Sequence, residues 1–159
     1  MKSRIGEGGM QTNFVNLTQV IVPNGKALSN RILGPREQDA HVDAIVDASI
    51  RNNAPRNITG VLIYNGLNFL QVLEGTRLNV EEVFNRIVQD PRHISVTTVL
   101  AESAELRMFA GWSMAGRKTS ALAGRHEYEK IGETQDVLAR QMPARVRQIL
   151  ENFCSLKGI

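Results

Sequence analysis

The chain has 159 residues, of which 42% are hydrophobic and 22% are charged, with a net charge of +3. That length suits one domain with a single core, and the apolar fraction excludes a disordered protein. Cys154 is the only cysteine, which excludes a disulfide framework and a cysteine-built metal site. No apolar run reaches the roughly 18 residues of a membrane span, and the first residues lack the apolar segment of a signal peptide. The composition predicts a cytoplasmic, single-domain protein.

The positive charge is concentrated at the C-terminal end. Residues 115–159 hold 8 Lys/Arg and 5 Asp/Glu, whereas the first 114 residues hold 11 of each sign. A nucleic-acid binder usually shows a dense basic stripe with interleaved aromatic residues, and this sequence has neither. We interpret the excess as a solvated helix face, with an acidic partner as the less favoured alternative. No nucleic-acid or membrane partner is predicted.

The first third of the chain predicts a strand and a helix. Residues 1–13 are polar and glycine-rich, which is typical of a flexible leader. The β-branched run 17–22 (LTQVIV) predicts a strand that ends in the turn Pro23-Asn24-Gly25. A helix is expected from Pro35 to about Asn53, because Pro55 ends it. Its apolar face has helical spacing and comprises Val42, Ile45, Val46 and Ser49.

The middle of the chain predicts a hairpin, a second helix and two further strands. The apolar runs 58–64 and 67–73 flank Asn65-Gly66, the strongest short hairpin signal. The second helix stops at Asp90-Pro91. Residues 94–101 and 107–114 (RMFAGWSM) are then predicted as strands. The apolar face of the second helix comprises Val80, Val83, Phe84 and Ile87.

This order predicts the α+β class: a ferredoxin-like βαββαβ sandwich with a fifth strand. Residues 120–141 are polar with weak helical periodicity, whereas 142–155 carry a clear apolar stripe. Helices on one face leave the other face of a sheet bare, so C-terminal helices are expected to cover it. The predicted divisions are a leader (1–13), a main domain (14–116) and a helical extension (117–159).

No enzyme motif is present in the sequence. His41, His93 and His126 lie in three separate segments without a carboxylate pairing pattern. There is no glycine-rich phosphate loop, nucleophile elbow or metal-ligand spacing. The residues by themselves therefore do not indicate an enzyme.

Several polar residues lie on elements that should be buried. By strand alternation, Gln71 shares a face with Phe69 and Leu73, where a buried amide needs a partner for both donor and acceptor. An equally open alternative is that Gln71 faces solvent or caps a neighbouring loop. Asn52 and Asn53 suit a helix C-terminus, or could bind the edge of a planar heterocycle.

Two further pairs of residues have an ordinary structural explanation when each pair is considered alone. Arg86 and Asp90 are four residues apart on the second helix, a spacing typical of a surface ion pair. Trp112 and Met114 are expected to share a strand face, where both would ordinarily be core residues.

Together, these segments resemble a known family. The stretches RNNAPRNITGVLIYNGLNFLQVLEG, NRIVQDPRH and FAGWSM are similar to those of the BLUF family, flavin-binding domains that sense blue light. The resemblance covers about residues 17–114 and is nearest to the short stand-alone members. It implies the ferredoxin-like fold derived above. It also implies that FAD, or FMN in part of the family, binds non-covalently between the two helices that pack on the sheet.

The resemblance also implies roles for individual residues. Asn53 would hydrogen-bond the isoalloxazine edge, with Asn52 and Ser49 beside it, and Phe69 would pack on the ring. Gln71 matches the glutamine that exchanges its hydrogen bonds with the flavin. Trp112 and Met114 match the pair that competes for the place beside Gln71 and carries the signal outward. The second-helix residues that would contact the ring, ribityl chain or phosphate are Arg86, Ile87, Asp90 and His93.

One departure from the family pattern concerns the photochemistry. Val22 stands where the family has a tyrosine that gives the excited flavin an electron and a proton, and Asn24 stands where it has a serine. The two tyrosines of this chain, Tyr64 and Tyr128, lie outside that motif position. Valine has no redox chemistry and no hydroxyl to hold Gln71, which predicts an impaired photocycle.

Three functions remain open at the level of the sequence. The favoured one is a FAD-binding sensor without the usual light-induced red shift, with Trp112 as a slow substitute donor. The second is a flavin-free protein-interaction module on the same fold. The least favoured is a flavin-dependent redox enzyme. The resemblance implies an output through contacts with another protein, and a homo-oligomer formed through the C-terminal helix or the sheet edge.

Overall fold

The computed structural model describes residues 13–21, 35–65, 68–91, 93, 95–118 and 131–155. Its first half contains β1 (Asn13–Ile21), α2 (Pro35–Asn53), η1 (Ala54–Arg56), β2 (Thr59–Tyr64) and β3 (Asn68–Gly75). Its second half contains α3 (Arg77–Gln89), β4 (Ser95–Ala104), β5 (Ala115–Lys118), β6 (Ile131–Glu133), α5 (Gln135–Leu138) and α6 (Ala144–Ser155).

The strands form one six-stranded sheet in the order β4-β1-β3-β2-β5-β6. The first four are antiparallel neighbours, and their order with the two crossover helices is that of a ferredoxin-like fold. This confirms the predicted fold class. β5 extends the sheet by pairing parallel to β2, and β6 pairs parallel to β5. The short strand β6 was not predicted, because three residues in a polar stretch give no periodicity.

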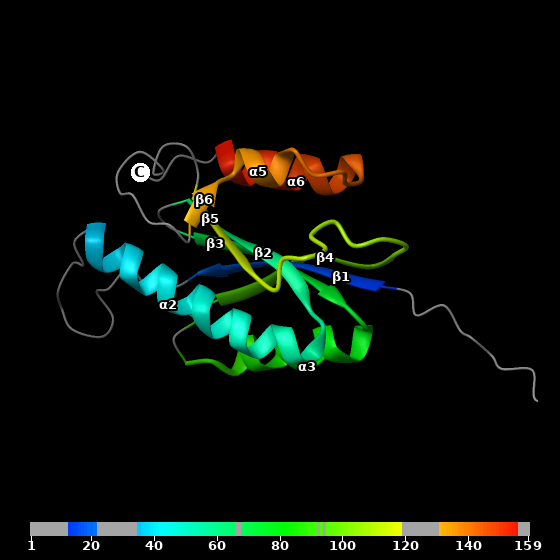
Figure 1. Cartoon of the computed structure of the whole chain (residues 1–159), viewed down its shortest axis with the longest axis horizontal. Helices are drawn as coiled ribbons and strands as arrows, with labels where there is room; N and C mark the ends of the chain where they lie inside the picture. The colour runs from blue at the N-terminus through cyan, green and yellow to red at the C-terminus, as the bar shows by residue number, and fades with distance from the viewer. Residues whose placement is uncertain are drawn as a thin grey trace, which may run out of the picture.

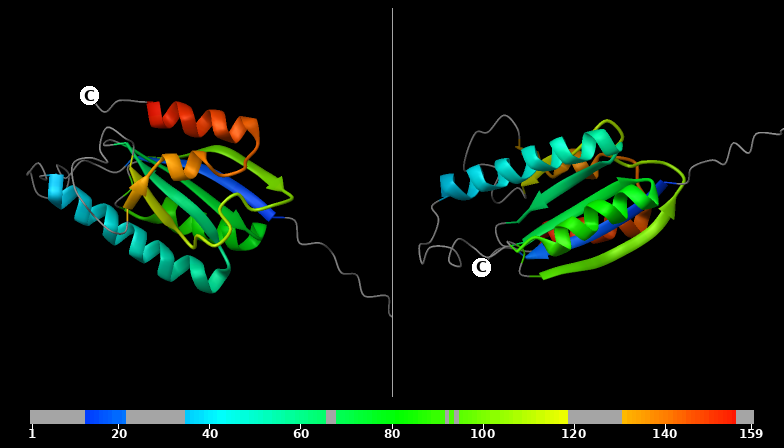
Figure 2. Two further views of the ribbon diagram at one scale, coloured as in Figure 1. Left: turned by 45° about the horizontal axis from the view of Figure 1, so that its top comes forward. Right: turned by 90° about the horizontal axis from the view of Figure 1, so that it is seen from below.

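Helices cover both faces of the sheet (Figure 1). α2 and α3 lie side by side on one face, here called the α2/α3 face (Figure 2), whereas α5 and α6 cover the opposite α5/α6 face. Strand alternation divides the core accordingly. Phe69 and Leu73 pack with Val46 of α2, whereas Leu70 and Val72 pack with Leu150 of α6. The prediction that C-terminal helices cover the second face is confirmed.

Local signals set the ends of the hairpin and of α3. The Thr76 hydroxyl caps α3 by accepting the Asn79 N–H over 3.3 Å, and α3 ends at Gln89, just before Asp90-Pro91. β2 and β3 pair as the predicted antiparallel hairpin. The Asn65 side-chain oxygen accepts the Asn68 N–H over 2.9 Å at the loop. These contacts lie within a few residues, which is why the sequence pattern predicted them well.

The prediction of a strand over 107–114 is wrong. The segment is an irregular connection between β4 and β5, and the strand begins only at Ala115. The N–H groups of Met108 and Phe109 are accepted by the side chain of Glu74, not by a neighbouring strand. The backbone N–H groups of Met108 and Phe109 in this apolar run are therefore paired without a neighbouring strand.

Two further sequence expectations concern the ends of the main domain and the membrane. The predicted leader lies outside the described residues, apart from Asn13, which begins β1. β5 spans the predicted boundary at residue 116. Within the described ranges, no helix combines the length and apolar character that crossing a membrane requires.

Candidate functional site

A cavity of about 200 Å³ lies between α2, α3 and the sheet. Its walls come from β1, α2, β2, β3 and α3, with Asp90 and His93 following α3. All the residues that the sequence assigned to cofactor binding line this one cavity: Ser49, Asn52, Asn53, Phe69, Gln71, Arg86, Ile87, Asp90 and His93. The fold therefore brings together residues from positions 49 to 93 of the chain.

Apart from Phe69 and Ile87, the apolar residues of the wall were not predicted from the sequence. The small side chains of Ala44 and Ala48 line the cavity one turn apart on α2, in line with Asn52. That spacing of small residues was the available signal, because it leaves room beside a helix. The remaining missed residues are Val20, Ile45, Leu62 and Val83.

Gln71 is buried and faces the cavity. Its exposed fraction is 5%, and Phe69 and Leu73 of the same strand pack in the α2/α3 core, as predicted. The alternative that Gln71 points to solvent is wrong. Among the described residues, its amide has no hydrogen-bond partner. Because Gln71 lines the cavity, its donor and its acceptor are both available to a polar ligand there.

Asn53 presents a second buried amide to the cavity, with an exposed fraction of 1%. Its Nδ2 donates to the carbonyl oxygen of Ser113 over 3.0 Å, which fixes the side chain. The Oδ1 acceptor remains for a ligand donor. Ser49 donates its hydroxyl to the Ile45 carbonyl over 2.8 Å, so its oxygen can only accept from a ligand.

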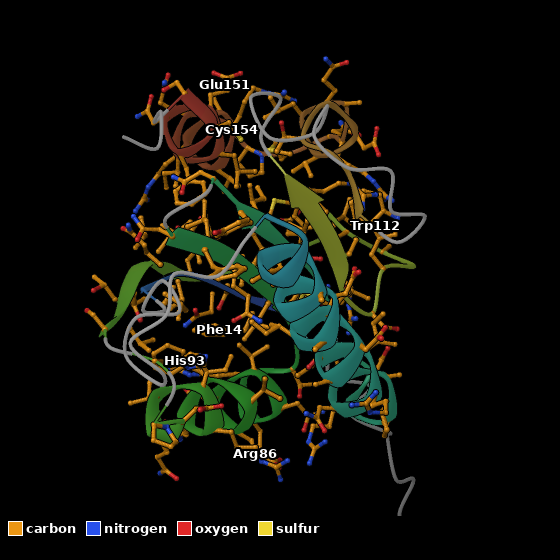
Figure 3. The ribbon with its side chains drawn as sticks, turned by 90° about the vertical axis from the view of Figure 1, so that its left-hand side faces the viewer. Phe14, Arg86, His93, Trp112, Glu151 and Cys154 are labelled. Atoms are coloured by element: carbon orange, nitrogen blue, oxygen red, sulfur yellow. The ribbon has the colours of Figure 1, made fainter. Side chains whose placement is uncertain are left out.

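The α3 side of the cavity carries charged and ring groups (Figure 3). Arg86 pairs with Glu82 over 2.9 Å, and Arg56 from η1 approaches the same carboxylate over 3.2 Å. His93 Nδ1 lies 2.7 Å from the Ile87 carbonyl, a contact that orients the ring. Because a carbonyl only accepts, Nδ1 carries the proton in this contact, which leaves Nε2 as an acceptor in the neutral ring.

An aromatic stack backs the sheet side of the cavity. Phe69 lines the cavity, and its ring stacks on Tyr64 with 4.7 Å between ring centroids. Tyr64 is buried in the same core cluster. A rigid aromatic wall of this kind suits a flat apolar ligand surface.

Trp112 and Met114 lie on different sides of the sheet. Met114 is buried in the α2/α3 core, whereas Trp112 packs against the α5/α6 core. The expectation that they share a strand face is wrong, because the segment that carries them is not a strand. Trp112 lies apart from Arg86 and His93 in Figure 3. The guanidinium groups of Arg117 and Arg140 lie 4.5 and 4.0 Å from its ring centroid.

The chemistry of this site is that of recognition. Apolar side chains and an aromatic ring form the walls, and two buried amides define a polar rim, which suits a planar heterocycle with donors and acceptors on its edge. In the described part of the chain, no group of three or more His, Cys, Asp or Glu side chains is arranged to hold a metal.

Comparison with known proteins gives the same result as the geometry. Residues 29–115 match the family model described as "BLUF: Sensors of blue-light using FAD". The Escherichia coli blue light- and temperature-regulated antirepressor BluF is 35% identical over 68 residues, which are 43% of this chain and 17% of that protein. The photoactivated adenylate cyclase subunit beta of Euglena gracilis is 35% identical over 118 residues, 73% of this chain and 12% of that protein. This chain therefore spans less than a fifth of either relative.

Among solved structures, Klebsiella pneumoniae BlrP1 with FMN and cyclic diGMP superposes with a TM-score of 0.65 and 29% identity. The superposition covers 90% of this chain and 34% of that one. The family model matches more than half of this chain, on the fold and around the cavity described above. This chain belongs to the BLUF family of blue-light sensors.

Proposed function

We propose that this protein binds the isoalloxazine ring of FAD in the cavity and serves as a signalling protein with an impaired photocycle. The observation that carries the proposal is the pair of buried amides on the cavity wall, Asn53 and Gln71, of which Gln71 has no partner among the described residues. A flavin edge offers both donors and acceptors to such groups. When bound, the flavin would supply the absorption of blue light.

The size of the cavity supports a ring-binding site. At about 200 Å³ it is smaller than the roughly 300–1,000 Å³ of sites that enclose a whole drug-sized ligand. It therefore suits the ring system, with the ribityl and phosphate groups extending toward the mouth. Arg86 lines the cavity and contacts Glu82, which Arg56 also contacts, and either cation could exchange this carboxylate for a phosphate.

The cavity residues have separable roles in this proposal. Asn53 keeps its Nδ2 on Ser113 and offers Oδ1 to a ring N–H, which fixes the orientation of the ring. Gln71 offers a donor and an acceptor whose positions exchange when the amide rotates, without any backbone movement. Ser49 and His93 add acceptors at the rim.

The impaired photocycle follows from the first strand. Val22, at the family's tyrosine position, lies outside the described residues; within them, β1 contributes only Val20 to the cavity wall. Neither valine has a hydroxyl group or redox chemistry. The family match begins at residue 29, after this strand, which is consistent with a first strand that departs from the family pattern. The position of Trp112 on the α5/α6 face argues against it as the substitute donor.

The output is proposed to be a contact with another protein, and the protein is proposed to form homo-oligomers. β4 is the outer strand of the sheet beside β1, and its residues 97–99 are exposed. Among the described strands, β4 has a neighbour on one side only, and this strand edge and the outer surface of α6 are the two candidate contacts. The adenylate cyclase activity in the name of the Euglena relative belongs to a protein of which this chain matches only 12%, and it is not part of the proposed function.

The deciding experiment is the visible absorption spectrum of the purified chain in the dark and under blue light. Flavin bands that do not shift on illumination support the proposal, and chromatography of the released chromophore distinguishes FAD from FMN. A reversible red shift would show an intact photocycle and contradict the role given to Val22. A colourless protein that does not take up added FAD would favour the flavin-free interaction module.

A further inference from the structure

Glu74 is a fully buried carboxyl group that the proposed flavin chemistry does not use. It lies on β3 three residues after Gln71, has an exposed fraction of 0%, and does not line the cavity. Strand alternation directs it to the α5/α6 face, opposite Gln71. One strand thus carries the proposed switch residue on one face and a buried acid on the other.

The oxygens of Glu74 bind the connection between β4 and β5. They accept the N–H groups of Met108 and Phe109 over 2.5 and 2.9 Å, and the Thr59 hydroxyl over 3.1 Å. Met108 and Phe109 are themselves buried, so their N–H groups need a protein partner. The neighbouring backbone of β3 cannot supply one, because β1 and β2 pair with β3 on both sides.

A continuous set of contacts leads from Glu74 to the C-terminal helices. Phe109 is fully buried, and its ring stacks on Trp112 with 5.7 Å between centroids. The backbone N–H of Trp112 donates to the Phe109 carbonyl over 3.0 Å, which fixes the turn between them. Arg140, just after α5, lies over the Trp112 ring at 4.0 Å and donates to the Ala110 carbonyl over 3.4 Å.

The C-terminal end of the connection, at Trp112 and Ser113, is held by hydrogen bonds from β2 and α2. Gly60 of β2 donates its N–H to the Trp112 carbonyl over 2.8 Å, and Asn53 donates to Ser113. A Cβ at position 60 would lie 1.9 Å from the Val72 carbonyl oxygen, so only glycine fits there. The segment 107–114 therefore has one anchor at Glu74 and a second at the cavity wall.

From these contacts we infer that Glu74 is the positioning residue that sets the conformation of residues 107–114, holding Trp112 on the α5/α6 face while Met114 stays on the α2/α3 face. It links β3 to the C-terminal helices through Phe109, Trp112 and Arg140. The inference concerns the fold of the chain itself and holds whether or not flavin is bound, so its test is separate from that of the proposed function.

The test uses the full chain in ¹H–¹⁵N correlation spectra. Trp112 is the only tryptophan, so its indole N–H gives one resonance that reports its surroundings. In the unmodified protein, the amides of Met108 and Phe109 should exchange as slowly as those of β3, although they lie outside any strand. Glu74→Gln keeps one acceptor oxygen but sets an amide NH2 against one of the two backbone N–H groups. The protection of the amide that loses its acceptor should fall about tenfold or more, and the indole resonance should move.

Glu81→Gln is the matched control, because Glu81 makes only an exposed pair with Arg77 on α3. It should leave both readouts unchanged. A purely structural role for Glu74 would lower the urea midpoint while the native indole resonance and the relative protection of residues 108 and 109 stayed as they were, and that result would overturn the inference. If Glu74→Gln does not fold, fast exchange of these two amides in the unmodified protein would also overturn it, and slow exchange would support it.

Discussion

The Nδ2 of Asn53 donates a hydrogen bond to the carbonyl oxygen of Ser113 over 3.0 Å, across 60 positions of sequence. Asn53 also lines the cavity, and Ser113 lies between Trp112 and Met114. One side chain therefore contacts both the proposed ligand site and the segment proposed to carry its signal.

Asn53→Ala should destabilise the protein by about 1–3 kcal/mol, because it leaves the Ser113 carbonyl without its donor and removes a buried amide. It should also weaken flavin binding. Urea unfolding and flavin titration measure the two effects. Asn52→Ala is the neighbouring control: Asn52 is exposed, so its stability change should stay within about 0.5 kcal/mol. Equal destabilisation by the two substitutions would contradict the role of the Asn53 contact.

Gln71→Leu should have opposite effects on stability and on binding. In the flavin-free protein it replaces a buried amide that has no partner among the described residues, so the free energy of unfolding should rise by about 1 kcal/mol. Flavin affinity should fall by about tenfold, since the polar contact is lost. Gln89→Leu, the same change at an exposed position at the end of α3, should alter neither quantity much. A loss of stability in Gln71→Leu without any change in affinity would speak against the ligand role.

Val22→Tyr should restore a light response, because it returns a redox-active phenol to the family's tyrosine position. The expected result is a reversible red shift of the flavin bands under blue light, measured by difference absorption. Val20→Tyr tests the register of this strand. Val20 lines the cavity, so a tyrosine there should fill the ring site and abolish flavin binding. A red shift in Val20→Tyr would mean that the strand has been placed in the wrong register.

The buried acid predicts a specific dependence of stability on pH. Burial raises the pKa of Glu74 above its ordinary value of 4.5, against the opposing effect of its hydrogen bonds. Above pH 4.5 the folded state therefore holds this proton more tightly than the unfolded chain. The free energy of unfolding should fall as the pH rises toward the raised pKa, by up to about 1.4 kcal/mol per pH unit.

Urea unfolding of the unmodified protein and of Glu74→Gln between pH 4 and 8 measures this contribution. The difference between the two curves isolates Glu74 from the other carboxyl groups, and it should shrink as the pH rises. A difference that stays constant over this range would show that Glu74 has the same affinity for protons in the folded and unfolded states.

The sequence predicted much of the fold because its signals were local. The run 58–64, Asn65-Gly66 and the run after it predict a hairpin from contacts a few residues apart, and β2 and β3 confirm it. The same logic failed at 107–114, where an apolar run resembled a strand. The backbone N–H groups of Met108 and Phe109 donate to Glu74, which lies 34 and 35 positions earlier in the chain. No local pattern in the sequence encodes that pairing.

The sequence by itself determined the order of helices and strands from β1 to β4, the family and the set of polar residues around the cavity, since each depends on residue types and short spacings. Only the tertiary structure decided which face of the sheet each residue occupies. Gln71 is buried because α2 and α3 cover its face, and Trp112 lies on the other face because Phe109, Arg117 and Arg140 hold it there. The packing of α2 on β3 and the contact of Arg140 with Trp112 join segments that are distant in the sequence, so they form only when the sheet and both helix layers come together.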